Sequence, residues 1–425
     1  MQRLHNMLTF KQFLKEESAP KKNLHLEHIE DEIFNFGTYG AREAINFLQS
    51  LRDMLSGESA SRVKVTVKFD GAPALFVGTD PSDGKFFVGT KGVFNKDAKL
   101  VKSMDDIEKL GYKGGLANKL KIAFEELQTL GIDGVLQGDM MFTKEDLSSV
   151  KVDGKQYTIF QPNTIVYAVP TGSALDDKIK TAQIGIVFHT TYTGDSLESM
   201  GATFGADVSN LKKTPRVWYS DVNYEDYSGS VSMTKSETNE ITKALSEAGK
   251  SFRKVVSGDL DAFLKHQNSL PSSVIGASIK TYNNSKIRVG EKVINTRSHA
   301  RAYPDYIEKY YETKILPKVK SDAGKDKKNK EKEDFVKKVK GWMSVVEASL
   351  ELHNHLVDAK MMIINKLDKG FKKFPNTFVR TDSGYKVVND EGYVAIDTIK
   401  GDAVKLVDRL EFSYNNFNGI KNWVK

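Results

Sequence analysis

The residues of this chain that could do chemistry begin with Lys68, two positions before an Asp-Gly turn. The run Val63–Phe69 alternates apolar residues as a strand does, and Asp70-Gly71 is typical of the tight turn that follows a strand. A lysine at a strand end has its stem packed by the sheet and its amine at the mouth of any cleft that the sheet lines. Lysine is also a basic side chain whose pKa shifts readily, so this amine could act as a nucleophile.

The Lys68 motif is a weak signal by itself, because an exposed strand lysine before a hairpin turn is equally compatible with it. Its weight depends on the elements that surround it, which must form a cleft and bring other polar residues there. The sequence pattern predicts helices at Gly40–Leu55, Lys113–Leu130, Thr234–Phe263 and Asp334–Lys369. It predicts further strands at Ala74–Val77, Lys85–Thr90, Gly134–Phe142, Tyr157–Phe160, Thr164–Val169, Gln183–Tyr192, Phe378–Val388, Gly392–Ile396 and Ala403–Val407.

The chain changes character at about residue 205. Before it, strand patterns follow an N-terminal helical segment, 1–60; after it, helical periodicity dominates until Pro375-Asn376, where strands return. We therefore expect an α+β fold in which antiparallel sheets are flanked by helices. The sheet domain consists of two sequence-distant parts, 61–204 and 375–425, and a mainly helical, lysine-rich insert at 205–374 separates them.

Composition narrows the classes of protein to consider. A chain of 425 residues with 39% hydrophobic and 28% charged residues predicts a soluble protein of two or three structural units. It has no cysteine, which excludes disulfide-linked partners and thiolate metal sites and favours the cytoplasm. No apolar run reaches the length of a membrane span, so we expect no membrane partner. The net charge of +7 is compatible with a polyanionic partner.

Further motifs follow Lys68 in a fixed order: Lys91-Gly92, Gln137-Gly138-Asp139, the aromatic strand Val187–His189 with Phe188, Glu391-Gly392-Tyr393-Val394, and Lys405 in a strand. Together with Lys68-Phe69-Asp70-Gly71 they resemble the motifs of the nucleotidyltransferase superfamily, which contains ATP-dependent DNA and RNA ligases and mRNA capping enzymes. The resemblance is closest to divergent phage RNA-ligase-like proteins. It covers the two sheet segments and neither the N-terminal segment nor the insert.

The resemblance implies an ATP-grasp-like ligase adenylation domain that uses ATP and Mg²⁺. Lys68 would attack the α-phosphate and carry AMP, while Lys405 and Lys91 would contact phosphates. Asp139 and Glu391 would hold Mg²⁺, directly or through water, or Asp139 would bind the ribose. The remaining implied contacts are adenine stacking by Phe188, orientation of the loop or a ribose hydroxyl by Asp70, and close backbone approach at Gly71.

Each of these residues also has a purely structural interpretation. Asp139 could be a strand-end turn residue, and Glu391 lies in a polar stretch that could simply join two strands. Phe188 could belong to the core, with Tyr167 in a neighbouring strand competing for the stacking role. For Lys405 the alternative is an exposed strand lysine.

The sequence lacks two lysines of the family pattern. The family's E-G-x-V motif normally continues to a lysine, and Ile396 occupies that position here; its last motif often has two lysines, and Val407 replaces the second. Asp139 also stands where the family has glutamate. Only a short segment follows Lys405, which leaves no room for the C-terminal OB domain of DNA ligases and capping enzymes.

The insert offers two candidates for contacting nucleic acid. The lysine run 314–340 is interleaved with acidic residues, which favours a solvated, flexible helix or linker over a phosphate clamp. The stretch Ser285–Tyr311 mixes cations with tyrosines and is the better candidate.

We therefore expect an RNA-ligase-like enzyme acting through AMP on Lys68, with RNA favoured over DNA as partner, in the host cytoplasm if a phage encodes it. The alternative is a catalytically inactive ligase-like protein of a phage that binds nucleic acid or nucleotide. A third hypothesis is a phage structural or assembly protein in which the Lys68 motif is coincidental. The sequence does not specify the oligomeric state.

Overall fold

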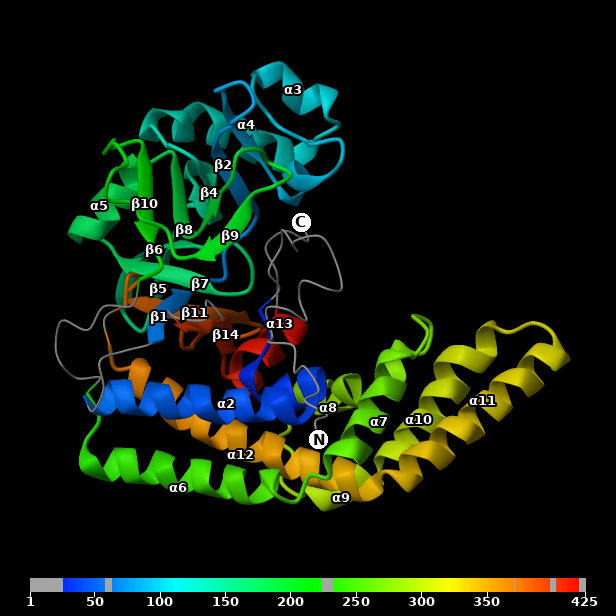
Figure 1. The fold of residues 1–425 in the computed structure, drawn as a ribbon. Coiled ribbons are helices and arrows are strands. Elements are labelled where there is room, and N and C mark those ends of the chain that lie inside the picture. The colour runs from blue at the N-terminus through cyan, green and yellow to red at the C-terminus, as the bar shows by residue number, and fades with distance from the viewer. Residues whose placement is uncertain (1–25, 58–62, 224–231, 371, 398–402, 420–425) are drawn as a thin grey trace, which may run out of the picture.

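The computed structural model describes residues 26–57, 63–223, 232–370, 372–397 and 403–419. They form a mixed α+β fold, in which β-sheets lie above a layer of long helices (Figure 1). The strands are β1 (Val63–Lys68), β2 (Ala74–Thr79), β3 (Phe86–Gly89), β4 (Val135–Thr143), β5 (Ser148–Val152), β6 (Lys155–Phe160), β7 (Val166–Pro170), β8 (Ile184–Thr193), β9 (Gly201–Phe204), β10 (Val217–Asp221), β11 (Asn376–Thr381), β12 (Gly384–Val387), β13 (Gly392–Asp397) and β14 (Ala403–Leu406).

The helices are α2 (Glu32–Ser56), α3 (Met104–Lys109), α4 (Gly114–Leu127), α5 (Ala174–Thr181), α6 (Lys235–Phe252), α7 (Ser257–Asn268), α8 (Ile279–Arg288), α9 (Thr296–Arg301), α10 (Tyr303–Tyr310), α11 (Asp322–Gly341), α12 (Met343–Leu367) and α13 (Tyr414–Asn418). Short 3₁₀ or π turns are η1 (Ile29–Asp31), η2 (Lys91–Phe94), η3 (Gln128–Leu130), η4 (Lys144–Asp146), η5 (Ile275–Ala277), η6 (Tyr311–Ile315), η7 (Leu316–Lys318) and η8 (Arg409–Ser413). Within the described residues, no helix is long and apolar enough to pass through a membrane.

A six-stranded sheet forms much of the upper part of the molecule (Figure 1). Its strands run in the order β10-β8-β4-β2-β3, with β9 paired to β8, and all pairs are antiparallel except β10 with β8. One face is covered by α4, whose buried residues Leu120 and Leu127 pack with Leu75 of β2 and Ile186 of β8. The other face is therefore the one available to line a cleft.

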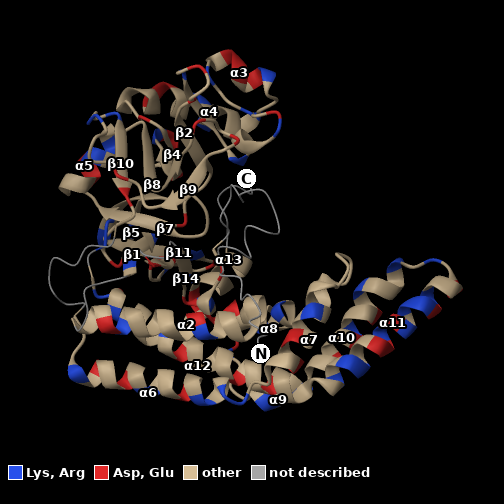
Figure 2. Cartoon of the chain, in the orientation of Figure 1, with Lys and Arg blue, Asp and Glu red and all other residues tan. Residues whose placement is uncertain are grey.

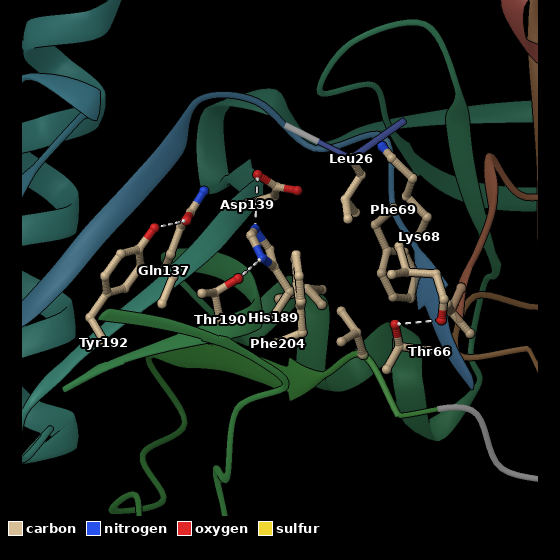
Figure 3. A pocket seen from close by; sticks show the side chains of 15 residues that line it. Leu26, Thr66, Lys68, Phe69, Gln137, Asp139, His189, Thr190, Tyr192 and Phe204 are labelled. Carbon is tan, nitrogen blue, oxygen red and sulfur yellow. Dashed lines mark hydrogen bonds and ion pairs between the residues drawn. The ribbon is translucent and has the colours of Figure 1, made fainter. Parts of the chain in front are cut away.

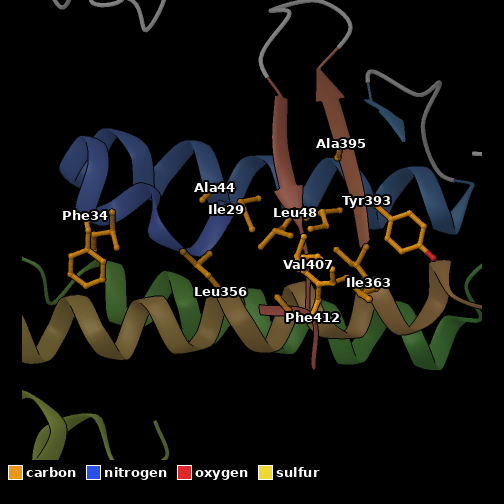
Figure 4. Packing of buried hydrophobic residues seen from close by; sticks show 14 of the residues in the cluster. Ile29, Phe34, Ala44, Leu48, Leu356, Ile363, Tyr393, Ala395, Val407 and Phe412 are labelled. Atoms are coloured by element: carbon orange, nitrogen blue, oxygen red, sulfur yellow. The ribbon is translucent and has the colours of Figure 1, made fainter. Parts of the chain in front are cut away.

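A three-stranded sheet, β1-β13-β14, joins the beginning and the end of the chain. Its apolar face packs on the helical layer, where Ala395 and Val407 meet Leu48 of α2 and Ile363 of α12 (Figure 4). A five-stranded sheet, β12-β11-β7-β6-β5, lies beside it. Strands of the segment 61–204 thus pair with strands of 375–425 twice, β1 with β13 and β7 with β11.

The helical layer combines the described part of the N-terminal segment, 26–57, with the insert; the remainder of the helical segment expected at 1–60 lies outside the described residues. Helix α2 packs against α6 and α12 (Figure 1), because it buries a stripe of small and apolar residues that includes Ala41, Leu48 and Leu55. The expected boundary at 204 falls between β9 and β10, yet both strands pair with β8 in one sheet. Residues 217–221 therefore belong with the sheet and not with the helical insert.

Most of the lysine-rich run is helical, the first of the two forms expected for it, a helix or a linker. Residues 322–341 are helix α11, which with α10 extends away from the sheets (Figure 1). Figure 2 shows acidic and basic residues interspersed along α11, and Lys328 and Lys338 pair with acids one turn away at 2.6 and 2.8 Å. These i,i+3 and i,i+4 pairs support the helix and reduce the cationic charge left for a partner.

Candidate functional site

A pocket lies between the open face of the six-stranded sheet and the three-stranded sheet (Figure 3). Its enclosed volume is about 150 Å³, a size that in proteins holds one small ring. The lining residues are Leu26, Thr66, Val67, Lys68, Phe69, Gln137, Asp139, Val187, His189, Thr190, Tyr192, Ala202, Phe204, Val222 and Val394. The nucleophile candidate, Lys68, is among them.

Lys68 is brought to Glu391 by strand pairing. β1 and β13 are antiparallel, and Lys68 lies opposite Gly392. Glu391, the residue before Gly392, is therefore close to Lys68 on the neighbouring chain segment, and Lys68 Nζ forms an ion pair with Glu391 Oε1. The side chains are 25% and 9% exposed. Gly392 is required here, because its φ is +142° and an added Cβ would lie 2.3 Å from the carbonyl oxygen of Leu406.

The ion pair sits in a partly desolvated place that shifts both pKa values. Burial raises the pKa of Glu391 to about 7, against the opposing charge of Lys68. Burial alone would lower the pKa of the Lys68 amine, but the charge and hydrogen bond of Glu391, together with the charges of Asp139 and Asp70, outweigh it and raise the pKa. In the ligand-free protein, the amine is therefore held as an ammonium.

Lys405 supplies a second cation close to the first. In the three-stranded sheet, Thr66 lies opposite Val394 and Val394 lies opposite Lys405, so these positions share the face that borders the pocket. Burial lowers the pKa of the Lys405 amine, and the charge of Lys68 lowers it further. Two lysine amines that influence each other, one of them lining the pocket, form a cationic place suited to an anion.

Asp139 enters the pocket from β4, the middle of the six-stranded sheet. Its Oδ1 lies 3.7 Å from Nε2 of His189 on β8, and Nδ1 of His189 is 2.8 Å from Oγ1 of Thr190 (Figure 3). Asp139 also contributes to raising the pKa of Lys68, which places the two groups within electrostatic reach. Lys68 and Asp139 thus line the pocket, whereas Glu391 and Lys405 are not among its lining residues and lie beside Lys68 in the three-stranded sheet.

Asp70 points away from the pocket and holds a loop. Its carboxylate accepts hydrogen bonds from the backbone N–H groups of Thr164 and Ile165 at 2.7 and 2.8 Å and from Nδ2 of Asn163 at 2.7 Å. The loop orientation suggested by the sequence agrees with these contacts, whereas Asp70 is not among the pocket-lining residues. Gly71 allows the turn to approach β4, since an added Cβ would lie 2.4 Å from Cβ of Asp139.

Two residues predicted for the site lie elsewhere. Phe188 is fully buried on the opposite face of β8, in the core with Leu75 and Met140, so its ring is not open to a ligand. The competing Tyr167 is also fully buried, and its hydroxyl accepts the backbone N–H of Asp70. Lys91 is exposed at the start of η2 and does not line the pocket.

The pocket residues that sequence reasoning missed follow from alternation along the strands. If Asp139 faces the pocket, Gln137 two positions earlier faces it as well, and on β8 the same period turns Val187 and His189, rather than Phe188, toward the pocket. An irregularity in the pairing at His189 brings Thr190 to the pocket too. Phe204, on the edge strand β9, supplies an aromatic ring to the lining. The sequence shows the alternation along each strand, but it does not show which of the two faces lines the pocket.

The two missing lysines are replaced by buried apolar residues. Val407 is 1% exposed in the core between the three-stranded sheet and the helices, and Ile396 is 8% exposed. A lysine at Val407 would be buried against apolar neighbours, so this part of the site is built without a second cation.

The donor set of the pocket is suited to a metal ion that arrives with phosphates. The described residues contain no group of three or more His, Cys, Asp or Glu side chains arranged to hold a metal ion. Mg²⁺, however, commonly binds through one or two carboxylates plus substrate phosphates. Asp139 and Glu391, which both interact electrostatically with Lys68, fit that limited role.

The tyrosines of the stretch Ser285–Tyr311 form part of the helical core. Tyr303 and Tyr311 are 0% and 1% exposed, and Tyr282 stacks on His299 with ring centroids 4.1 Å apart. Tyr306 and Tyr310 of the same stretch are half-buried, so contact of this stretch with nucleic acid stays a prediction.

Comparison with known proteins gives a family but no relative of known activity. No curated protein and no solved structure matches the chain. One family model, described as a family of unknown function (DUF6267), matches residues 23–421, which include every strand and helix described above. The chain therefore belongs to the DUF6267 family.

Proposed function

We propose that this protein is an ATP-dependent nucleotidyltransferase of the polynucleotide-ligase type, in which Lys68 forms a covalent bond to AMP. The observation that carries the proposal is the Lys68–Glu391 ion pair at the pocket, with Lys405 on the same sheet. Lys68 and Asp139 from two of the motifs line that pocket, Asp70 holds the turn after Lys68, and Glu391 from a third motif pairs with Lys68. In this proposal the sheets form a nucleotidyltransferase domain.

The proposed step is a displacement at phosphorus. When Glu391 turns from Lys68 to the metal ion, the Lys68 ammonium gives one proton to water, and the neutral amine attacks the α-phosphate of ATP and passes a second proton to water as the new bond forms. A nitrogen–phosphorus bond forms, the bond from the α-phosphorus to the bridging oxygen breaks, and pyrophosphate leaves with the electron pair. The products are lysyl-AMP and pyrophosphate, and polynucleotide, with RNA favoured, would accept the AMP afterwards.

The neighbouring charges suit this step. Lys405 would contact the α-phosphate, and its lowered pKa is of the kind that binding a phosphate would reverse. Asp139 and Glu391 would hold Mg²⁺, which would neutralise charge on the phosphate oxygens. Asp70 keeps the turn after Lys68 fixed to the Thr164–Ile165 backbone, so the lysine has a rigid base.

Intact mass spectrometry after incubation with ATP and Mg²⁺ tests the proposal. We expect an AMP adduct that is absent from Lys68→Ala and retained by Lys102→Ala, a matched lysine that pairs with Asp80 outside the pocket at 2.7 Å. Pyrophosphate release should parallel the adduct. Absence of both adduct and pyrophosphate over a range of pH would rule out the enzyme.

The burial of Val407 and Ile396 favours a second candidate function. With two phosphate-binding cations missing, the same pocket could bind nucleotide without reacting, or the protein could bind nucleic acid as a catalytically inactive relative. Equilibrium dialysis with radiolabelled ATP separates the two functions: bound nucleotide that is fully released on denaturation supports the inactive relative, and nucleotide retained on the denatured chain supports the enzyme.

A further inference from the structure

Leu26 closes one side of the pocket without belonging to a strand. Its side chain points into the pocket between Asp139 and Lys68, from the short segment 26–28 that precedes η1 (Figure 3). Of the described residues that line the pocket, Leu26 alone lies neither on a strand nor next to one in the sequence. The position of this wall therefore depends least on the pairing of the sheets.

Few contacts attach the segment 26–28 to the edge of the three-stranded sheet. Lys405 of β14 donates its backbone N–H to the carbonyl oxygen of Glu27 at 3.0 Å, and His28 forms an isolated parallel bridge with Lys405. The Glu27 carboxylate pairs with Lys280 of α8 at 3.3 Å, with 39% and 36% of the two side chains exposed. An ion pair so exposed adds little stability, so the segment can leave the sheet edge at low cost.

The residues that follow the segment are fixed much more firmly. Ile29 is 0% exposed, and the carboxylates of Glu30 and Asp31 are buried and paired with cations of the interior. His28 lies at the boundary, and its Nδ1 is buried without a hydrogen-bond partner among the described residues. An unpaired buried nitrogen disfavours the closed position. The chain is thus anchored at η1 and weakly held just before it.

In the closed position the segment keeps a large anionic ligand from both site lysines. The enclosed volume of about 150 Å³ holds one small ring, whereas a nucleotide brings a two-ring base, a ribose and phosphates. Leu26 occupies space between the proposed nucleophile, Lys68, and the proposed metal ligand, Asp139 (Figure 3). The negative charge of Glu27 acts on the Lys405 amine and therefore opposes a phosphate that approaches it.

We propose that residues 26–28 form a strap that closes the pocket and must swing away about His28 before a nucleotide binds. Movement of the strap takes Leu26 out of the space between Lys68 and Asp139 and takes the Glu27 carboxylate away from Lys405. The anchored η1 stays in place. The strap thus regulates access to the site. This inference rests on the proposed function for the size and charge of the ligand, whereas closure over Lys68 is a property of the protein alone.

Acetylation of Lys68 measures closure without any nucleotide. Full-length protein is treated with limiting N-hydroxysuccinimidyl acetate, and peptide mass spectrometry gives the rate at Lys68 relative to Lys102. Lys102 is a suitable reference, because it lies outside the pocket, is also ion-paired, and is 22% exposed against 25% for Lys68. Leu26→Ala shortens the closing side chain, so this ratio should rise at least about threefold.

Leu116→Ala is the matched control for the acetylation, since it shortens a leucine of α4 that is 38% exposed and lies outside the pocket. It should leave the ratio of the two rates unchanged. An equal ratio in Leu26→Ala and in the parent protein overturns the strap. Circular dichroism spectra and thermal midpoints show that each variant measured is folded.

Hydrogen exchange at the Lys405 amide measures the movement itself, because this N–H is bonded to Glu27 of the strap. The experiment uses α,β-methylene-ATP, in which a carbon bridge prevents transfer of AMP. With the analogue bound, we expect the Lys405 amide to exchange at least about threefold faster. The amide of Val101, bonded to the carbonyl oxygen of Val88 at 2.9 Å outside the pocket, is the control and should not change. Unchanged or slower exchange at Lys405 would overturn displacement of the strap by the ligand.

The affinity for the analogue separates the inference from the function on which it rests. Leu26→Ala should bind α,β-methylene-ATP roughly 3- to 10-fold more tightly than the parent, because less of the binding free energy is used to open the strap. Equal or weaker binding by folded Leu26→Ala overturns the strap and leaves the AMP adduct on Lys68 possible. Failure of the analogue to bind to either protein overturns the proposed nucleotide site, and the acetylation ratio then decides on the strap.

Discussion

Two of the lysine–glutamate pairs, Lys360–Glu30 and Lys68–Glu391, lie in different surroundings, and the difference distinguishes a structural ion pair from one at a candidate site. Lys360 on α12 donates to Glu30 of η1 at 2.6 Å, and both side chains are 1% exposed. Lys68 pairs with Glu391 with 25% and 9% of the side chains exposed, at the wall of a pocket. Both pairs join parts of the chain that are far apart in sequence, but only the second can reach a ligand.

The buried pair belongs to a network that joins the ends of the chain to the insert. Arg409 of η8 lies 3.3 Å from Asp31, and Nε2 of His353 on α12 lies 3.2 Å from the same carboxylate. Every member has opposite charge beside it, as buried ions require. The Lys68 pair has fewer fixed partners and more water, which is the arrangement expected of groups that exchange partners when a ligand binds.

Exchanging each lysine for methionine should separate the two pairs most strongly. Lys360→Met leaves Glu30 buried without its nearest cation, so we expect the free energy of unfolding to fall by about 3–5 kcal/mol. Urea unfolding followed by circular dichroism measures the change. Lys68→Met is the matched control and should cost much less, because Glu391 borders the pocket and can take up a proton.

The double variant Glu30→Leu/Lys360→Met sharpens the same test. Removal of both charges avoids the uncompensated ion, so most of the lost stability should return. Equal destabilisation by Lys360→Met and Lys68→Met would contradict the distinction between the two pairs.

Replacing Asp70 tests whether a residue of the Lys68 motif stabilises the fold, as the buried ion-pair network does. Asp70→Asn replaces a carboxylate that accepts two backbone N–H groups and the Asn163 amide, so we expect a loss of about 1.5–3 kcal/mol in the free energy of unfolding. Asp139→Asn, at a half-buried pocket position, is the control and should change stability little. A larger loss of stability for Asp139→Asn than for Asp70→Asn would contradict the structural role assigned to Asp70.

Local patterns predicted most elements because their signals are short-range. Alternation identified strands β1, β4 and β8, and helical periodicity identified α4 and α12. The pattern did not show that β1 and β2 belong to different sheets, because the turn at Asp70-Gly71 reads as a hairpin while long-range pairing takes β1 to β13. The strand β10 was missed for the same reason, since its place depends on β8.

The candidate site shows a similar division. The pairing of Lys68 with Glu391 could be anticipated only through the ordered motifs, because nothing local in either segment indicates the other. Phe188 was misplaced because periodicity gives the alternation of a strand and not which face is covered by α4. The network around Glu30 was not anticipated, since lone charged residues in helices normally predict exposed faces.

The buried pair should also impose a characteristic pH dependence. Burial would raise the pKa of Glu30, but Lys360, with His28 and Arg409, lowers it to about 2, below the ordinary value of 4.5. Its stabilising effect is therefore complete above about pH 4.5 and is lost as the pH falls toward 2. We expect Glu30→Gln to be less stable than the parent by about 2 kcal/mol above pH 4.5, with the difference narrowing between pH 4.5 and 2. A constant difference across this range would contradict the charge interaction.

The pocket pair should show the opposite sign, in a smaller effect. Because burial raises the pKa of Glu391 from 4.5 to about 7, its ionisation costs more in the folded protein than in the unfolded chain. The contribution of Glu391 to stability is thus complete below about pH 4.5 and declines as the pH rises to 7. Glu391→Gln cannot ionise, so relative to it the parent should lose on the order of 1 kcal/mol between pH 4.5 and 7. Glu333→Gln on exposed α11 is the control and should track the parent in urea unfolding at each pH. If instead the parent gained stability relative to Glu391→Gln as the pH rose, as expected for Glu30, the Lys68–Glu391 pair would be a structural ion pair like the buried one. The proposal that Lys68 changes partners when a ligand binds would then fail.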